Sequence, residues 1–385
     1  MDTNKKAVYW LSSAHGIIDI YSGMLSPIMP FIAAKMGFSL AIATMIISIS
    51  QAIASTLQPV FGYFSDITKK RVFIFWGLFI GAIANPIAAN VDHIWILLFF
   101  AILGTLGGSM YHPQALGFIS KFSDKNSVFN MSLFVTMGTL GFAISPLISS
   151  VIVQFFGFRH LLFVSVLGVC MALLMFKCVP KIQNFDYKVE KDGKKILNDI
   201  FSNKIMIILF VIGMMKTLIQ SSTSIMMPFL WKDMGHAPIY VGFSMFLFLF
   251  AGGMGSFVSH WFERKCGAKF VFYFSLIINF PLMIIYAMTY KNFPVFSMII
   301  FILIGFFTAF AQPVTLVMAQ KTLPQYKSIV SGIINGLTWG IVSVLLLWLG
   351  ILAEEYGIIN ILISLSVLPV ISSILVKDLP NSVEE

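Results

Sequence analysis

A histidine and an aspartate stand four residues apart in the apolar stretch SSAHGIIDIYSGMLSPIMPF, residues 12–31. In an α-helix this spacing places the side chains of His15 and Asp19 on one face, within reach of each other. Imidazole and carboxylate groups are the side chains that most readily hold and pass protons. The pair therefore predicts a proton-coupling site, provided that a helix carries it through an apolar environment.

Other polar side chains recur at helical spacing in stretches that are otherwise apolar. Such rows predict polar helix faces that line a common cavity. For the glutamines, hydrogen bonds between helices are an equally open interpretation, and for His15 and His112 a packing role also stays open. The candidate substrate contacts are Lys216, His112, Gln51, Gln58, Gln220 and Gln312.

The composition indicates that these residues lie in a membrane. The chain is 58% apolar and only 11% charged, whereas about a quarter of the residues of a soluble domain are charged. Apolar segments of about 20 residues recur, and as helices they would cross a hydrocarbon core of about 30 Å. Helices are expected because lipid satisfies no backbone hydrogen bonds. We predict twelve spans: 8–34, 39–64, 73–91, 94–119, 128–155, 160–179, 205–231, 239–262, 270–289, 295–319, 328–350 and 357–376.

The net charge of +9 does not indicate nucleic-acid binding, because the basic residues are sorted to one side. If the N-terminus is cytoplasmic, the termini and the cytoplasmic turns hold 20 of the 25 lysines and arginines. The predicted outer turns hold Lys35, Arg159, Lys232 and Lys291. This asymmetry follows the positive-inside rule and predicts an even number of spans with both termini in the cytoplasm.

Two charged residues lie deep inside predicted spans, Asp19 and Lys216, whereas Lys177 lies at the cytoplasmic end of its span. A charge at the centre of a spanning helix costs about 2.5–3.5 kcal/mol on insertion scales, so each is expected to have a partner. Both lie roughly 11 or 12 residues into their helices, near the membrane midplane. We therefore expect Asp19 and Lys216 to face one another across a central cavity and to interact.

An internal repeat divides the chain into two halves. The stretch MPFIAAKMG (29–37) recurs as MPFLWKDMG (227–235), and HPQALGFISK (112–121) aligns with QPVTLVMAQK (312–321). A parallel repeat of six spans with a site between the halves is a transporter plan. The predicted organisation is an N-terminal bundle over 1–180, a cytoplasmic linker over 181–204 and a C-terminal bundle over 205–385.

One cytoplasmic loop carries a family motif. The stretch GYFSDITKKR (62–71) resembles the loop signature of the major facilitator superfamily, with Gly62, Asp66, Lys70 and Arg71 in place. The resemblance covers nearly the whole chain. It implies an all-α membrane protein with twelve transmembrane helices in two pseudo-symmetric bundles, and it implies that this loop is a gate.

Two further motifs narrow the family. The stretch GTLGFAISPLISS (138–150) resembles the antiporter signature of the superfamily, with Gly138, Gly141 and Pro146 kept. The His-x-x-x-Asp of residues 15–19, together with His112 and its following proline, resembles the fosmidomycin-resistance branch, whose members are drug exporters. That branch usually has a glutamate where this chain has Gln114, so proton coupling is expected to depend more on Asp19.

The expected function is proton-coupled export of a small organic anion, zwitterion or drug-like molecule by alternating access. An anion at Lys216 would compete with Asp19 for the cation and so exchange with a proton. Uptake of an organic acid, sugar or amino acid with protons is an alternative, as is a receptor or scaffold that does not transport. No hydrolase, metalloprotease or phosphate-loop motif is present, so an enzyme is not expected.

The remaining expectations concern cofactors and surroundings. The spacing of histidines and cysteines matches no metal motif, so we expect neither a metal nor a cofactor beyond the proton gradient. The expected partners are a small-molecule substrate, protons and the lipid bilayer, without nucleic acid. Short loops favour a multi-pass protein of the bacterial inner membrane, and the family resemblance implies a monomer.

Overall fold

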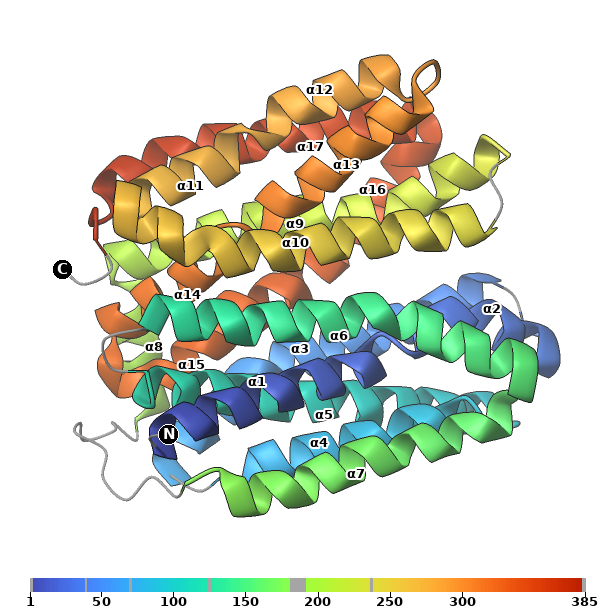
Figure 1. The fold of residues 1–385 in the computed structure, drawn as a ribbon, viewed down its shortest axis with the longest axis horizontal. Coiled ribbons are helices and arrows are strands. Elements are labelled where there is room, and N and C mark those ends of the chain that lie inside the picture. Colours follow the sequence, from blue (N-terminus) through green and yellow to red (C-terminus); the bar gives the residue numbers. More distant parts are fainter. Residues whose placement is uncertain are drawn as a thin grey trace.

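The structure is a computed structural model that describes residues 3–38, 40–68, 71–123, 127–180, 192–235 and 238–382. All regular secondary structure in these ranges is helical. Figure 1 shows the helices of the first half packed as one bundle against those of the second half. The first half comprises α1 Thr3–Ser22, α2 Leu25–Met36, α3 Leu40–Thr68, α4 Val72–Ala88, α5 Ile94–Lys121, α6 Ser127–Phe156, the 3₁₀ turn η2 Phe158–His160 and α7 Leu161–Cys178.

The second half follows the short helix α8 Gly193–Phe201, which occupies part of the predicted linker. Residues 181–191 of that linker lie outside the described residues. The helices of this half are α9 Lys204–Asp233, α10 Pro238–Cys266, α11 Ala268–Ile277, α12 Asn279–Thr289, α13 Pro294–Ala309, α14 Gln312–Thr322, η3 Pro324–Tyr326, α15 Lys327–Ser331, the π-helical η4 Gly332–Leu337, α16 Thr338–Tyr356, α17 Ile358–Ser372 and η5 Ser373–Asp378.

The predicted apolar segments coincide with these helices. Each of the twelve segments falls on one helix or on consecutive helices. Among the described residues, nine helical stretches are long and apolar enough to cross a bilayer, and Val72–Ala88 is a shorter apolar helix. The protein is therefore an all-helical, multi-pass membrane protein, while the count of twelve crossings and the cytoplasmic termini stay predictions.

Several predicted spans are not single uninterrupted α-helices. The span 8–34 divides into α1 and α2, because Pro27 has no N–H to donate to the carbonyl of Gly23, four residues earlier. The span 295–319 divides for the same reason ahead of Pro313. The span 328–350 contains the π-helical turn η4. Such breaks are tolerated in a membrane where neighbouring helices satisfy the freed backbone groups.

Glycines with positive φ recur at the spacing of the repeat. Gly157 and Gly357 both adopt the left-handed region, with φ of 83° and 86°, and each N–H closes the end of a long helix, α6 or α16. Gly37 and Gly235 form a second such pair, with φ of 72° and 81°. Because only glycine adopts this region at little cost, these pairs, spaced by about half the chain, indicate two halves built on one plan.

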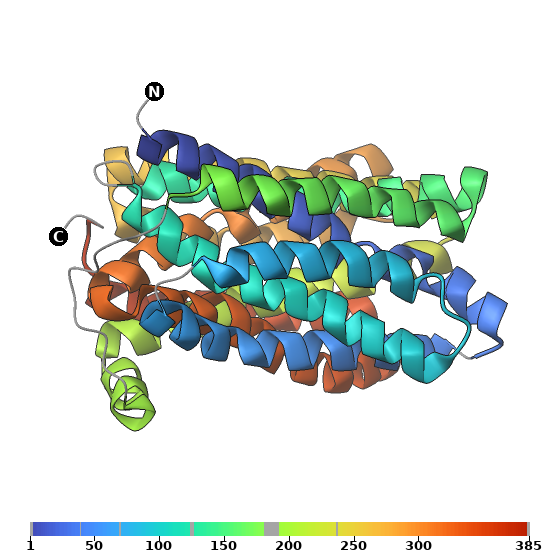
Figure 2. The ribbon, with the colours of Figure 1, turned by 90° about the horizontal axis from the view of Figure 1, so that it is seen from below.

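The backbones of the two halves come into close contact toward one end of the molecule. The start of α1, the end of η5 and α8 all lie at this end, which we call the terminus end (Figures 1 and 2). There the backbone of α3 packs directly on α15 and η4: a Cβ added to Gly62 would come within 2.5 Å of the carbonyl oxygen of Ser328, and one added to Gly332 would come within 2.8 Å of that of Gln58. Helices α6 and α10 also pack together across the two halves.

Candidate functional site

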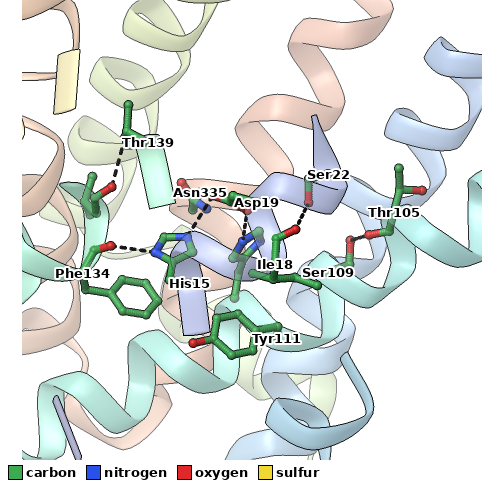
Figure 3. Close-up of polar contacts among 12 residues, drawn as sticks. His15, Ile18, Asp19, Ser22, Thr105, Ser109, Tyr111, Phe134, Thr139 and Asn335 are labelled. Carbon is green, nitrogen blue, oxygen red and sulfur yellow. Dashed lines mark hydrogen bonds and ion pairs between the residues drawn. The ribbon is translucent and has the colours of Figure 1, made fainter. Parts of the chain in front are cut away.

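His15, Asp19 and His112 form one compact cluster between α1 and α5. His15 Nε2 lies 3.3 Å from Asp19 Oδ2, and His112 Nε2 lies 3.0 Å from Asp19 Oδ1. Figure 3 shows the carboxylate of Asp19 beside the ring of His15. The three side chains keep only 11–15% of their surface exposed. The predicted pairing of His15 with Asp19 is present, and His112 completes it from another helix.

The orientation of His15 is set by α6. Its Nδ1 lies 2.7 Å from the carbonyl oxygen of Phe134, and its ring stacks on the Phe134 ring at a centroid distance of 4.0 Å. A Cβ added to Gly138 would overlap the His15 ring. The first glycine of the antiporter-like motif therefore makes the space that the imidazole occupies.

The other two residues of that motif lie further along α6. Gly141 brings the backbone of α6 against Gly16 of α1, so closely that any Cβ at position 141 would overlap the Gly16 carbonyl. Pro146 lies within α6 without interrupting it. Close backbone approach at small residues is the usual way in which membrane helices associate.

A separate polar cavity lies in the second half of the chain. It encloses about 410 Å³ of empty space, part of it open to solvent, and three predicted contacts line it: Lys216, Gln220 and Gln312. The other lining residues include Thr217, Thr308, Thr315, Asn335 and Trp339. Lys216 is 8% exposed, and its Nζ has no hydrogen-bond partner among the residues that the structure describes. A buried cation with free donors is suited to an anionic ligand.

The predicted interaction between Asp19 and Lys216 is not formed. In the described part of the chain, the ion pairs of Asp19 are those with the two histidines, and Lys216 Nζ makes no hydrogen bond. The prediction was wrong because it assigned the carboxylate to the only other charge in a span. Histidine can also carry positive charge, and His112 brings a second imidazole to Asp19 from α5.

The two glutamines of α3 do not line this cavity. Gln51 donates a hydrogen bond from Nε2 to Ser55 Oγ at 3.0 Å within α3. Gln58 is buried at the contact with η4, where a Cβ added to Gly336 would overlap its side chain. In this conformation Gln58 packs between the two halves of the chain.

The predicted gating motif connects the two halves at the terminus end. The carboxylate of Asp66, which is buried, accepts hydrogen bonds from the N–H of Ser328 at 3.1 Å and of Ile329 at 3.0 Å. Gly62, one turn earlier, lets the α3 backbone reach the same residues. The guanidinium of Arg71 instead donates to the carbonyl of Val179 and lies over the Phe176 ring. Lys70 lies outside the described residues.

The roles of two residues could not be assigned from the sequence. Asn335 lines the cavity, accepts a hydrogen bond from Gln312 and sits on the π-helical turn; a lone asparagine in a span flanked by glycine was the available signal. Gln114 is fully buried, accepts from the N–H of Ile74 and donates to Ser65 Oγ. Gln114 therefore joins α3, α4 and α5, a structural role that its type alone did not reveal.

The sequence profile of the Major Facilitator Superfamily matches residues 11–347. The chain belongs to the Major Facilitator Superfamily. It is 26% identical over 363 residues to the fosmidomycin resistance protein of Escherichia coli (strain K12), covering 90% of this chain and 86% of that protein. This similarity confirms the resemblance to the fosmidomycin-resistance branch.

Solved structures of Major Facilitator Superfamily members share the fold. The human organic anion transporter MFSD10 (TETRAN) superposes with a TM-score of 0.79 at 12% identity, covering 98% of this chain and all of that chain. The transporter FucP in the outward conformation gives 0.76 at 14% identity, covering 98% and 99%. Membership of this superfamily makes the protein a membrane transporter for small molecules rather than an enzyme.

Proposed function

We propose that this transporter exports a small organic anion or zwitterion across the bacterial inner membrane in exchange for protons, as a monomer. The observation that carries the proposal is the state of the two intramembrane charges. Lys216 is buried in a polar cavity of the second half with no hydrogen-bond partner among the described residues, whereas Asp19 is held by two histidines in the first half. The cavity at Lys216 is suited to an anion, and the cluster at Asp19 is suited to protons.

The substrate class follows from the residues around Lys216. A carboxylate, phosphonate or similar anion would satisfy the free donors of the ammonium group. Gln220, Gln312 and Asn335 offer amide donors and acceptors to the polar groups on the rest of the molecule. The names of two proteins that are similar to this chain, a fosmidomycin resistance protein and an organic anion transporter, agree with that class.

The coupling mechanism differs from direct competition between anion and carboxylate. Because Asp19 and Lys216 have separate surroundings, the anion cannot displace Asp19 from Lys216 in this conformation. Coupling instead runs through the movement of the two halves, which changes the access of both sites together. The His15–Asp19–His112 cluster then takes up a proton while the sites face one side of the membrane. Lys216 binds the anion while they face the other side.

The contacts at the terminus end hold the two halves in a conformation that is closed at this end. Asp66 and Gly62 of α3 hold the first turn of α15 across the two halves. If the termini are cytoplasmic, this conformation is closed toward the cytoplasm. Opening toward the cytoplasm requires that these hydrogen bonds break, which gives the loop motif the role of a latch.

The proposal is tested in everted membrane vesicles that contain the protein and a pH-sensitive dye in the lumen. Fosmidomycin and a panel of organic anions are added outside. Export coupled to protons predicts that substrate drives protons out of the lumen, and that Asp19→Asn and Lys216→Met abolish the signal. Lys291→Met, which changes an exposed lysine of a predicted outer turn, is the matched control and should behave like the parent.

The direction of proton movement and the proton signal of the variants distinguish the alternative functions. Substrate-driven acidification of the lumen would identify uptake with protons. A proton signal that persists in Asp19→Asn would remove Asp19 from the coupling path. Ligand binding with neither a proton signal nor movement of labelled substrate would identify a receptor.

A further inference from the structure

We propose that His15, Asp19 and His112 also form a binding site for a divalent transition-metal ion such as Zn²⁺. One potential ligand atom from each residue lies within 4.8 Å of those of the other two. Two imidazoles and a carboxylate are a donor set that Zn²⁺, Co²⁺ and Ni²⁺ favour over Mg²⁺ or Ca²⁺. The sequence gives no sign of this site, because the three residues are contributed by two helices, without any local spacing that is typical of metal sites.

The hydrogen bond to Phe134 leaves His15 Nε2 as a ligand. A backbone carbonyl only accepts, so the Nδ1 that lies 2.7 Å from it must carry the proton. In neutral imidazole the Nε2 atom then presents a lone pair, and this lone pair points at Asp19 Oδ2, 3.3 Å away. Two lone pairs facing each other at this distance require a cation between them, which is either a proton or a metal ion.

The surroundings of His15 resemble those of histidine ligands at metal sites. Histidine ligands usually donate the other ring N–H to a carbonyl or carboxylate, which fixes the tautomer and the ring orientation. Phe134 provides both the carbonyl and a stacking surface for His15. His112 can present its Nε2 lone pair to an ion as the tautomer that carries its proton on Nδ1, or, when it starts as imidazolium, by losing the proton on Nε2.

The spacing of the ligand atoms suits a tetrahedral ion. With metal–ligand bonds of about 2.0–2.1 Å, ligands at tetrahedral angles are separated by about 3.3 Å. Nε2 of His15 lies 3.3 Å from Oδ2 of Asp19 and Nε2 of His112 lies 3.0 Å from Oδ1, while one potential ligand atom from each residue lies within 4.8 Å of the other two. Small rotations of these side chains would therefore enclose an ion. Three protein ligands leave a fourth position for water or for a ligand atom of a transported molecule.

The metal site does not depend on the proposed transport function. Protons and the metal ion would compete for the same lone pairs, so a metal-free protein can still be coupled to protons. The partial exposure of the three side chains, 11–15%, gives an ion a route to them. The experiment therefore measures metal binding directly and does not use transport as the readout.

The test uses the full-length protein without an affinity tag, purified in detergent. Equilibrium dialysis against Zn²⁺ with metal quantification gives the stoichiometry, and the visible absorption of bound Co²⁺ gives the geometry. We expect one equivalent per chain with an absorption spectrum typical of four-coordinate Co²⁺. Asp19→Asn and His112→Gln should each weaken binding by more than about tenfold.

The matched control is His260→Gln, which changes a buried histidine in α10 and should leave the stoichiometry and affinity unchanged. Thermal unfolding of every variant checks that it is folded, and Asp19→Asn alters neither size nor shape. Binding of less than one equivalent by the parent, or equal binding by parent and Asp19→Asn, would overturn the proposal. So would a loss of binding in His260→Gln alone.

Discussion

Asp66 accepts hydrogen bonds from the backbone N–H of Ser328, at 3.1 and 3.3 Å, across the boundary between the two halves. The N–H of Ile329 donates to the same carboxylate at 3.0 Å. The first N–H groups of a helix have no partner within it and carry the positive end of its dipole. Asp66 of the loop motif therefore accepts hydrogen bonds from the free N–H groups at the start of the helical run Lys327–Tyr356. It can do so only while the terminus end is closed.

Replacing Asp66 with alanine should favour opening at the terminus end. A net contribution of about 1.5–3 kcal/mol for a hydrogen bond to a charged group predicts a shift of about tenfold or more in the ratio of closed to open states. The measurement is the rate of maleimide labelling at Ser65→Cys in a chain whose three native cysteines are replaced by serine. Ser65 is 1% exposed and contacts Ser328, so faster labelling reports opening.

The control for this variant is Asp92→Ala. Asp92 pairs with Lys35 at 2.7 Å, but its side chain is 82% exposed, and such a pair contributes little. Labelling at position 65 should be the same as in the parent. Equal labelling rates in Asp66→Ala and the parent would exclude a latch at Asp66.

Replacing Gly62 with alanine should prevent full closure by a steric route. The added Cβ would come within 2.5 Å of the Ser328 carbonyl oxygen and 2.8 Å of the Ile329 Cα, both of which are backbone atoms that cannot rotate away. We expect increased labelling at position 65 and slower transport. Gly193→Ala, where an added Cβ meets nothing within 4 Å, should change neither quantity.

Replacing Lys216 with methionine should separate function from stability. The variant loses the cation that we propose to bind the anion, so the affinity for an anionic substrate should fall by more than about tenfold. The buried lysine has no hydrogen-bond partner in the described residues, and removing a buried unpaired charge relieves its desolvation. The midpoint of thermal unfolding should therefore stay the same or rise. A variant that unfolds at a lower temperature and still binds substrate would show a structural role for Lys216.

Replacing Gly138 with alanine should displace His15. The added methyl group would overlap the imidazole ring, and overpacking of this kind costs about 1–3 kcal/mol. In a His15→Ala background the ring is absent, so the same substitution should cost much less. Thermal unfolding of the parent, the two single variants and the double variant measures this coupling. Additive effects would mean that Gly138 is needed for another contact.

The sequence by itself determined the class of protein and the plan of the fold. Long apolar segments at 58% apolar composition require helices in lipid, and these are local properties that do not depend on tertiary contacts. The repeat of residues 29–37 at 227–235 could be recognised in the sequence. The structure places Gly37 and Gly235, which correspond in this repeat, in the same left-handed conformation. The pairing of His15 with Asp19 was also predictable, because one helical turn brings both to the same face.

Only the tertiary structure decided which groups meet between helices. Spacing along α1 could not show that His112 of α5, rather than Lys216 of α9, is the partner of Asp19. The sequence also could not show that Asp66 reaches Ser328, more than 260 residues away, or that Gly138 makes room for His15. Side-chain periodicity gives the direction in which a residue points from its own helix. The distance to a residue on another helix depends on how closely the backbones pack, which is set by glycines and serines spread over the whole chain.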